Sequence, residues 1–462
     1  MHKTLVVDIV GLSESLIGPH TPFLQQWAAE HRVSRIRPML PALTTSVQSS
    51  YLTGLWPKDH GIVGNGWYDR QDCEIKFWKQ SNKLVQGEKI WERAKREDPS
   101  FSCAQICWWY NMYADVAYSV TPRPQYHADG VKLPDCYTQP QELRDVLQAE
   151  LGTFPLFQYW GPGADIRSSA WIARAAMKVD ALYHPTLSLV YLPHLDYCLQ
   201  KFGPRGTSMA AELGRVDAVV QELVGYFEQQ GARILLLSEY GITPVQRPVH
   251  INRLLREKGY LRVREEQGLE LLDPGASPAF AVSDHQIAHV YTQPGTDLAV
   301  LKNELRQVPG IDEVLDKTDQ QAYHLQHERS GDLVLLASPD SWFTYYYWLE
   351  ERKAPDFART VEIHRKPGYD PVEMFMSSRL RAAYKLLRKK LGFRYRMDVV
   401  PLDATLIRGS HGLPRAESGY QPLLIGQDPG LASELQAVDV YQAIWRSLTC
   451  NERVYNGLEQ ST

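Results

Sequence analysis

Residues Thr44 to Asn65 read TTSVQSSYLTGLWPKDHGIVGN, and this is the most informative segment of the chain. Small hydroxylated residues come first, followed by the apolar pair Tyr51-Leu52 and then by glycine. Threonine is a common N-cap, so a helix is predicted to begin at Thr44 or Thr45. The start of a helix also attracts anions, including phosphate groups. The segment therefore predicts a polar helix start that suits a phosphate-bearing ligand.

Around this segment the chain alternates between short apolar runs and helical patterns. Strands are predicted for the runs Thr4 to Val10, Ala104 to Trp109, Leu187 to Leu192, Arg233 to Leu237 and Ile287 to Tyr291. Helices are predicted for Pro22 to Glu30, Ser168 to Leu182 and Met209 to Gln229. This alternation is typical of an α/β fold with a mostly parallel central sheet flanked by helices.

The composition narrows the class of protein. The chain has 462 residues, of which 44% are hydrophobic and 23% charged, and its net charge is −4. It can bury a large core, and a stable complex with nucleic acid is not expected. The six cysteines do not form a disulfide framework, and we interpret Cys103 and Cys107 as buried thiols. No signal sequence or membrane-spanning run is seen, so a cytoplasmic location is predicted.

A more irregular region follows residue 250. It contains the run Ile287 to Tyr291, a helical pattern at Ala299 to Arg306 and turn residues beyond it. We predict a small inserted α+β cap at residues 251–345. The catalytic core would then consist of residues 1–250 and 346–462.

Polar residues that can bind metals follow several of the predicted strands. Parallel strands end at one edge of a sheet, and this edge is where α/β proteins place their chemistry. The residues in question are Asp8, the Thr44 to Gln48 segment, Asp196 with Gln200, Glu239 with Tyr240, and the later His411. Each is weak evidence alone, but together they predict a single site.

In these segments the chain resembles the alkaline phosphatase superfamily, specifically the type I phosphodiesterase/nucleotide pyrophosphatase family. In that family the nucleophilic threonine lies nine residues before the threonine of a TG-x-x-P-x-x-HGI-x-x-N segment. Here Thr53 begins that segment, so the resemblance implies Thr44 as the nucleophile, with Thr45 as its nearest competitor. The resemblance also implies an alkaline-phosphatase-like core, with the insertion as the family's cap.

The resemblance further implies two divalent metal ions. One site would contain Asp196, Gln200 and His411, and the other Asp8, Thr44, Glu239 and Tyr240. Gln200 and Tyr240 stand where the family has histidines, and Glu239 stands where it has aspartate. The family binds zinc, but this altered set of ligands leans toward Mg²⁺, Mn²⁺ or Ca²⁺. Three other histidines could compensate, namely His194, His250 and His364.

The function implied is metal-dependent hydrolysis of a phosphodiester or nucleotide-type pyrophosphate through a phosphothreonine intermediate. One alternative is a phosphomonoesterase or phosphonate hydrolase on the same scaffold, and another is a catalytically silent binding protein. A small anionic phosphate ester is the expected partner. Its candidate contacts are Gln48, Asn65, Trp109, Asn111, Arg123, His364, Arg365 and Lys366.

Residues 377–396 contain eight Lys or Arg and no acidic residue. Leu380, Tyr384, Leu387 and Leu391 fall at helical spacing within them. A basic amphipathic helix can lie on an anionic membrane. We favour the alternative in which its apolar side packs on its own domain.

Overall fold

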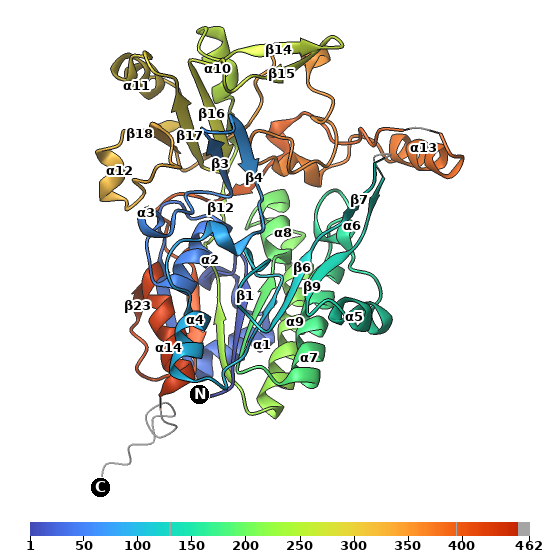
Figure 1. Cartoon of the computed structure of the whole chain (residues 1–462), viewed down its shortest axis with the longest axis vertical. Helices are drawn as coiled ribbons and strands as arrows, with labels where there is room; N and C mark the ends of the chain where they lie inside the picture. Colours follow the sequence, from blue (N-terminus) through green and yellow to red (C-terminus); the bar gives the residue numbers. More distant parts are fainter. Residues whose placement is uncertain (129–130, 394, 451–462) are drawn as a thin grey trace.

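The computed structural model describes residues 1–128, 131–393 and 395–450. Within these residues, nine strands form one central sheet in the order β23-β2-β22-β11-β1-β10-β5-β6-β9 (Figure 1). The strands are β1 (Thr4–Ile9), β2 (Arg32–Arg37), β5 (Cys103–Ile106), β6 (Tyr118–Pro122), β9 (Cys136–Gln139), β10 (Leu187–Leu192), β11 (Arg233–Leu237), β22 (Leu423–Gly426) and β23 (Glu434–Gln436).

The middle of the sheet is parallel, as predicted. Strands β11, β1, β10, β5 and β6 pair with one another in parallel, whereas β22 and β9 run antiparallel beside them. The bounds of β10 and β11 equal the predicted runs. Strand β5 ends earlier than predicted, at Ile106, because Cys107 adopts a left-handed backbone conformation with φ of 59°.

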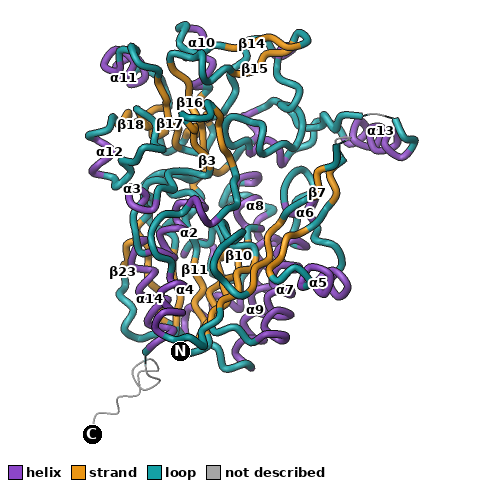
Figure 2. Tube along the Cα trace, in the orientation of Figure 1, coloured by secondary structure: helices purple, strands orange, loops and turns teal. Residues whose placement is uncertain are grey.

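Helices cover both faces of the sheet (Figure 2). One face is covered by α1 (Pro22–Glu30), α5 (Leu143–Leu151), α7 (Arg167–Tyr183) and α9 (Met209–Gln229). The other face packs against α2 (Thr44–Thr53), α4 (Ile90–Glu97) and α14 (Val440–Thr449). The two clusters bury large side chains on both sides of β1, which explains its continuous apolar sequence. Cys103 and Cys107 are buried in them, as predicted.

A second sheet lies at one end of the molecule, above the central sheet in Figure 1. In the described chain its four antiparallel strands are β16 (Ala279–Asp284), β17 (Ile287–Thr292), β19 (Leu333–Ala337) and β18 (Ile311–Leu315). Around it lie α10 (Ile251–Glu257), α11 (Leu298–Arg306), α12 (Asp319–Ala322) and the hairpin of β14 (Val263–Glu266) and β15 (Leu269–Leu272). This is an α+β unit inside the predicted insertion.

The hydrophobic core of this unit also uses residues from elsewhere in the chain. The hairpin of β3 (Gly66–Asp69) and β4 (Glu74–Phe77) packs against it, and the ring of Tyr68 contacts Phe280 and Tyr291 edge-on. The aromatic run at residues 342–348 is buried in the same core. The division of the chain at residues 250 and 346 remains a prediction.

The remaining elements are short connections around the site. They are α3 (Pro57–His60), β7 (Gln125–Tyr126), β8 (Lys132–Leu133), α6 (Leu156–Tyr159), α8 (His194–Phe202), β12 (Thr243–Pro244), β13 (Arg247–Val249), β20 (Ser341–Phe343), α13 (Arg379–Lys390) and β21 (Gly409–Ser410). Of these, α8 follows β10 directly and carries Asp196.

The fold predicts a large cost for truncating the α9 face that packs on the sheet. Leu223 of α9 is fully buried, so Leu223→Ala should lower the free energy of unfolding by about 2–5 kcal/mol through the cavity it leaves. Leu182 of α7 is 42% exposed, so Leu182→Ala is a matched control that should change it by about 0.5 kcal/mol or less. Urea denaturation measures both, and equal losses would contradict this packing.

Candidate active site

The predicted site residues meet at the carboxyl end of the parallel strands. Asp8 of β1 lies opposite Tyr191 of β10 and Leu237 of β11 in the sheet register. The chain positions that follow these two partners carry Asp196 and Glu239. Adjacent parallel strands thus bring three acidic residues, far apart in sequence, to one edge of the sheet.

Thr44 is the first residue of α2, and its hydroxyl faces this edge. Its Oγ1 lies 2.9 Å from the hydroxyl oxygen of Tyr240. The N-cap is Leu43, and no side chain caps the helix, so the N-capping role predicted for the threonines is wrong. Thr45 instead donates from its hydroxyl to the backbone oxygen of Gly64 at 2.9 Å. The geometry therefore favours Thr44 over Thr45 as the reactive hydroxyl.

Two buried carboxylates, Asp8 and Glu239, lie beside Gln48. The Gln48 amide nitrogen donates to Asp8 Oδ2 at 3.1 Å and to Glu239 Oε1 at 2.5 Å. Burial raises the pKa of Asp8, and burial together with the charge of Asp8 raises the pKa of Glu239 well above its usual range. The second oxygens, Asp8 Oδ1 and Glu239 Oε2, are buried without a hydrogen-bond partner. Among the described residues, the hydrogen-bond donor to both groups is the neutral Gln48 amide.

Asp196 is the third acidic residue of the site. Gln200 donates to its Oδ2 at 2.9 Å, and the Tyr240 hydroxyl donates to its Oδ1 at 3.4 Å. The Gln200 carbonyl oxygen accepts from the Tyr369 hydroxyl at 2.9 Å. Burial raises the pKa of Asp196 to about 7 and the pKa of Tyr240 well above 10, so Tyr240 stays a neutral phenol. Both polar ends of Gln200 are thus already used.

His411 is placed with its Nε2 toward Asp196. Nδ1 lies 2.8 Å from the backbone oxygen of Ala42, so Nδ1 carries the proton and Nε2 carries the lone pair. Nε2 lies 3.6 Å from Asp196 Oδ1 and has no hydrogen-bond partner. Burial lowers the pKa of His411 well below 6.5, which keeps the imidazole neutral. This is the state in which histidine binds metals.

The structure adds His285, to which the sequence assigned no role. Its Nδ1 lies 2.8 Å from Asp284 Oδ1, and its Nε2 is buried and unpartnered. Its ring stacks between His411 and Tyr369, with centroids 3.9 Å and 3.8 Å away. In metal-binding histidines one ring nitrogen usually contacts a carboxylate or carbonyl group, while the other binds the metal. His285 has this arrangement, because its Nε2 has no hydrogen-bond partner. The only sequence signal was the Asp-His pair in the β16–β17 turn.

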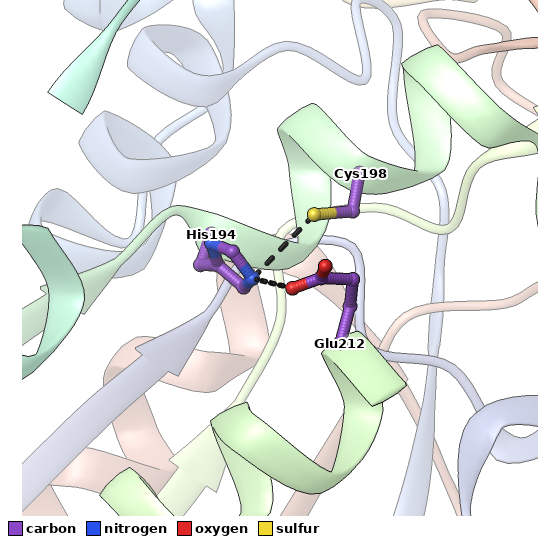
Figure 3. A group of neighbouring side chains, drawn as sticks. All are labelled: His194, Cys198 and Glu212. Carbon is purple, nitrogen blue, oxygen red and sulfur yellow. Dashed lines mark hydrogen bonds and ion pairs between the residues drawn. The ribbon is translucent and has the colours of Figure 1, made fainter. Parts of the chain in front are cut away.

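The three histidines proposed as substitutes lie elsewhere. His194 Nε2 contacts Glu212 Oε2 at 2.8 Å and Cys198 Sγ at 3.5 Å (Figure 3). His250 contacts Thr344, and His364 contacts the backbone of Phe77. These three histidines contact groups other than Asp8, Asp196 and Glu239, which does not support the compensation expected of them.

A separate cluster involves His194. Within the described residues, His194, Cys198 and Glu212 are the one group of three His, Cys, Asp or Glu whose ligand atoms lie within 4.8 Å of one another. Glu212 also pairs with Arg215, and burial raises the pKa of the Cys198 thiol. The cluster links α8 to α9 through the contacts of His194 Nε2, while His194 Nδ1 is buried without a hydrogen-bond partner (Figure 3).

The donors around Thr44 fit the divalent cations that the family implies. Asp8 and Glu239 each keep one buried oxygen without a partner, and two neutral imidazoles keep a vacant Nε2. Hard oxygen donors dominate near Thr44, which favours Mg²⁺, Mn²⁺ or Ca²⁺ there. Near Asp196 the engaged amide of Gln200 is a poorer donor than an imidazole. The fit is therefore better beside Asp8 and Glu239 than beside Asp196.

A cleft of about 1880 Å³ opens in front of Thr44. Its lining is mainly aromatic and apolar, and it includes Trp78, Trp109, Tyr159, Trp160, Tyr369 and Phe393. Asp196, Tyr240 and His285 also line it, so the cleft reaches the reactive edge of the sheet. Typical ligand pockets have volumes of about 300–1,000 Å³, so this one is large.

The predicted substrate residues divide into two groups. Residues of the first group line the cleft, and they are Trp109, Asn111, Arg123, His364 and Arg365. Asn111 is also buried, and its side-chain amide donates to the Val120 backbone oxygen at 2.8 Å.

Three further candidates have internal partners. Lys366 is buried between Asp370 at 2.7 Å and Glu373 at 2.6 Å, which does not support its expected substrate contact. Asn65 bonds to Asp284 and Thr45, and Gln48 bonds to Asp8 and Glu239. These two residues position the site from within.

The site combines a threonine at a helix start with acidic residues and a histidine, all at the carboxyl end of a parallel sheet. This arrangement is typical of an alkaline-phosphatase-like α/β protein. The family model for type I phosphodiesterase/nucleotide pyrophosphatase matches residues 4–370. The chain therefore belongs to this family, whose name describes enzymes that cleave phosphodiester and pyrophosphate bonds.

Individual relatives agree with this assignment. An uncharacterized pyrophosphatase/phosphodiesterase of Schizosaccharomyces pombe is 24% identical over 254 residues, which are 53% of this chain. The match covers 42% of that protein, so the chain spans about two fifths of its length.

Two solved structures share the fold. Phosphonoacetate hydrolase of Sinorhizobium meliloti, in complex with phosphonoformate, is 16% identical with a TM-score of 0.60, and the match covers 97% of this chain and 96% of that one. Murine ectonucleotide pyrophosphatase/phosphodiesterase 5, as an inactive variant with AMP, is 14% identical with a TM-score of 0.59, and the match covers 97% and 95%.

The vacant carboxylate oxygens predict stabilisation by cations. Added Mn²⁺ or Mg²⁺ should raise the melting temperature, because a cation at about 100 times its Kd stabilises the folded state by about 2.7 kcal/mol. Asp8→Asn should remove most of this increase and lower the metal content measured by mass spectrometry. Asp332→Asn, which changes contacts with Arg70 and Thr292 in the second sheet, is the control and should keep both. An unchanged response in Asp8→Asn would refute the assignment.

Proposed function

We propose that the protein hydrolyses phosphodiester or pyrophosphate bonds, with Thr44 as the nucleophile. The observation that carries this proposal is the position of the Thr44 hydroxyl, which lies at the start of α2 where the large cleft meets three buried carboxylates. The N-terminus of a ten-residue helix favours a bound phosphate group. Membership of the phosphodiesterase family supports the same reaction.

Tyr240 orients the nucleophile. Its hydroxyl lies 2.9 Å from Thr44 Oγ1 and 3.4 Å from Asp196 Oδ1. Thr44 can therefore donate its proton to the Tyr240 oxygen, while Tyr240 donates its own proton to Asp196. This chain of hydrogen bonds takes the proton from the attacking oxygen and leads it to a buried carboxylate.

The reaction proceeds in two displacements. The Thr44 oxygen bonds to phosphorus as the bond from phosphorus to the leaving oxygen breaks, which gives a phosphothreonine whose phosphorus still carries the other substituent of the substrate. Water then attacks the same phosphorus and restores the threonine. Divalent cations held by Asp8, Glu239, Asp196 and His411 would supply charge stabilisation. Gln48 keeps the two carboxylates Asp8 and Glu239 at a fixed separation.

The size of the cleft favours a substrate with a large organic group. About 1880 Å³ lined by aromatic rings exceeds what a small phosphomonoester or phosphonate fills. Arg123 and Arg365 lie in the lining and can contact an anion. A phosphodiester therefore fits better than the alternative small substrates.

Replacement of the nucleophile tests the proposal. Thr44→Val should lower the hydrolysis of bis-p-nitrophenyl phosphate with Mn²⁺ by about 10³-fold or more, because no hydroxyl remains to attack phosphorus. Thr44→Ser keeps a hydroxyl and should retain measurable turnover. Wild-type rates in purified Thr44→Val, with its melting temperature unchanged, would exclude this mechanism.

Removal of the Tyr240 hydroxyl tests the hydrogen-bond chain. Tyr240→Phe keeps the ring that stacks on His411 at 3.5 Å but loses both hydrogen bonds. We expect kcat to fall by about 10²–10⁴-fold, the range of general acid–base contributions, with little change in KM. Tyr191→Phe, a buried neighbour at the end of β10, is the control. If both variants lost activity equally, Tyr240 would have only a packing role.

A further inference from the structure

Helix α13 presents an apolar strip to solvent. Leu380, Tyr384 and Leu387 lie on one side of the helix, because successive residues are rotated by about 100° around its axis. Leu391 continues the strip, and its N–H bonds to the Leu387 carbonyl oxygen at 3.0 Å. These four side chains, the α13 strip, are all exposed, with Leu380 at 84% and Leu391 at 64%. The sequence favoured an apolar side packed on its own domain, and these exposures overturn that expectation.

The opposite side of α13 faces the cleft. Ala382 and Leu386 line it, together with Phe393 beyond the end of the helix. In Figure 1 the helix lies at the right edge of the molecule, away from the central sheet. The α13 strip therefore points away from the body of the protein while the other side of the helix helps to enclose the cleft.

Positive charges flank the α13 strip on both sides. By the same rotation of about 100° per residue, Arg388 lies on one side of the strip and Arg379 and Lys390 lie on the other. Asp398 pairs with Arg381 and Lys385, further around the helix. An apolar strip between two rows of cations is the pattern of a helix that lies in a bilayer surface among anionic headgroups.

Further exposed apolar residues line the cleft that α13 helps to enclose. Among the described residues, large exposed hydrophobic side chains at the cleft include Tyr126, Phe157, Met376, Leu386 and Phe393. Lys79, Lys132 and Arg396 also line the cleft and add positive charge. This patch combines exposed apolar side chains with cations beside a ligand cleft. Such a patch indicates an interaction surface, whereas isolated exposed apolar side chains do not.

We propose that the α13 strip docks on an anionic lipid surface. This proposal stands on the exposure and the charges of the helix and does not depend on the reaction proposed above. Within the described part of the chain, no helix has both the length and the apolar character that crossing a bilayer demands. Contact with the surface, with leucine side chains inserted and arginines at the headgroups, is the mode that this helix allows.

Vesicle cosedimentation tests the docking. The wild-type protein should pellet with phosphatidylcholine vesicles that contain phosphatidylglycerol at low salt, and less so with pure phosphatidylcholine or at high salt. Leu387→Glu/Leu391→Glu should weaken binding by at least about tenfold, because two apolar contacts become charged. No wild-type binding at low salt would overturn the proposal, as would equal binding to neutral and anionic vesicles.

A matched double variant controls for the added charge. Leu298→Glu/Val300→Glu adds the same two acids at exposed apolar positions, 41% and 48% exposed, on α11 of the other sheet. This variant should bind vesicles as the wild type does, and equal weakening would refute a role for α13. Both variants should keep the wild-type melting temperature and hydrolyse bis-p-nitrophenyl phosphate in vesicle-free buffer.

Discussion

The structure depends on how it keeps two carboxyl groups, those of Asp8 and Glu239, buried side by side. Asp8 and Glu239 lie at the ends of adjacent parallel strands, and the parallel register brings them together. Among the residues described, their hydrogen-bond donor is the neutral amide of Gln48; burial raises the pKa of both groups, and the charge of Asp8 raises the pKa of Glu239 further. A divalent cation bound there would stabilise the charged form of both groups, and the same charge would stabilise a transferring phosphoryl group.

The second sheet contributes to the site as well as covering it. Asp284, at the end of β16, accepts from the backbone N–H of Asn65 at 2.9 Å, and Asn65 in turn accepts from Thr45. The start of α2 is thus held from the inserted unit. His285, the next residue, reaches the stack of His411 and Tyr369. A displacement of this unit would therefore move Thr44 and rearrange the imidazoles together.

The buried polar groups and the wide cleft belong to different parts of the molecule. The Thr44 hydroxyl and the three carboxyl groups lie at the carboxyl end of the central sheet, whose core is fully buried. The wide wall of the cleft is built from loops, the β7–β8 hairpin and α13, which are more exposed. One scaffold can in this way keep a phosphoryl-transfer site while its outer wall sets which organic group is accepted.

The sequence by itself determined the elements whose information is local. The bounds of α1, α9, β10 and β11 were predicted correctly. Hydrophobic periodicity, and the polar, Gly or Pro residues that end an element, depend only on residues close together in the sequence. The positions of strand ends and a family motif also predicted which residues share one site, namely Asp8, Thr44, Asp196, Glu239 and His411. Only the tertiary structure decided the partners of these groups.

His285 of the inserted unit lies beside His411, and the side chain of Gln48 donates to the carboxyl group of Glu239. The Thr44 hydroxyl contacts Tyr240 instead of capping its helix. The exposed face of α13 was likewise undecided, because periodicity shows that a helix has an apolar side but not what covers it. Such contacts join residues hundreds of positions apart, and the physical reason they escape the sequence is that side-chain partners are set by packing rather than by spacing along the chain.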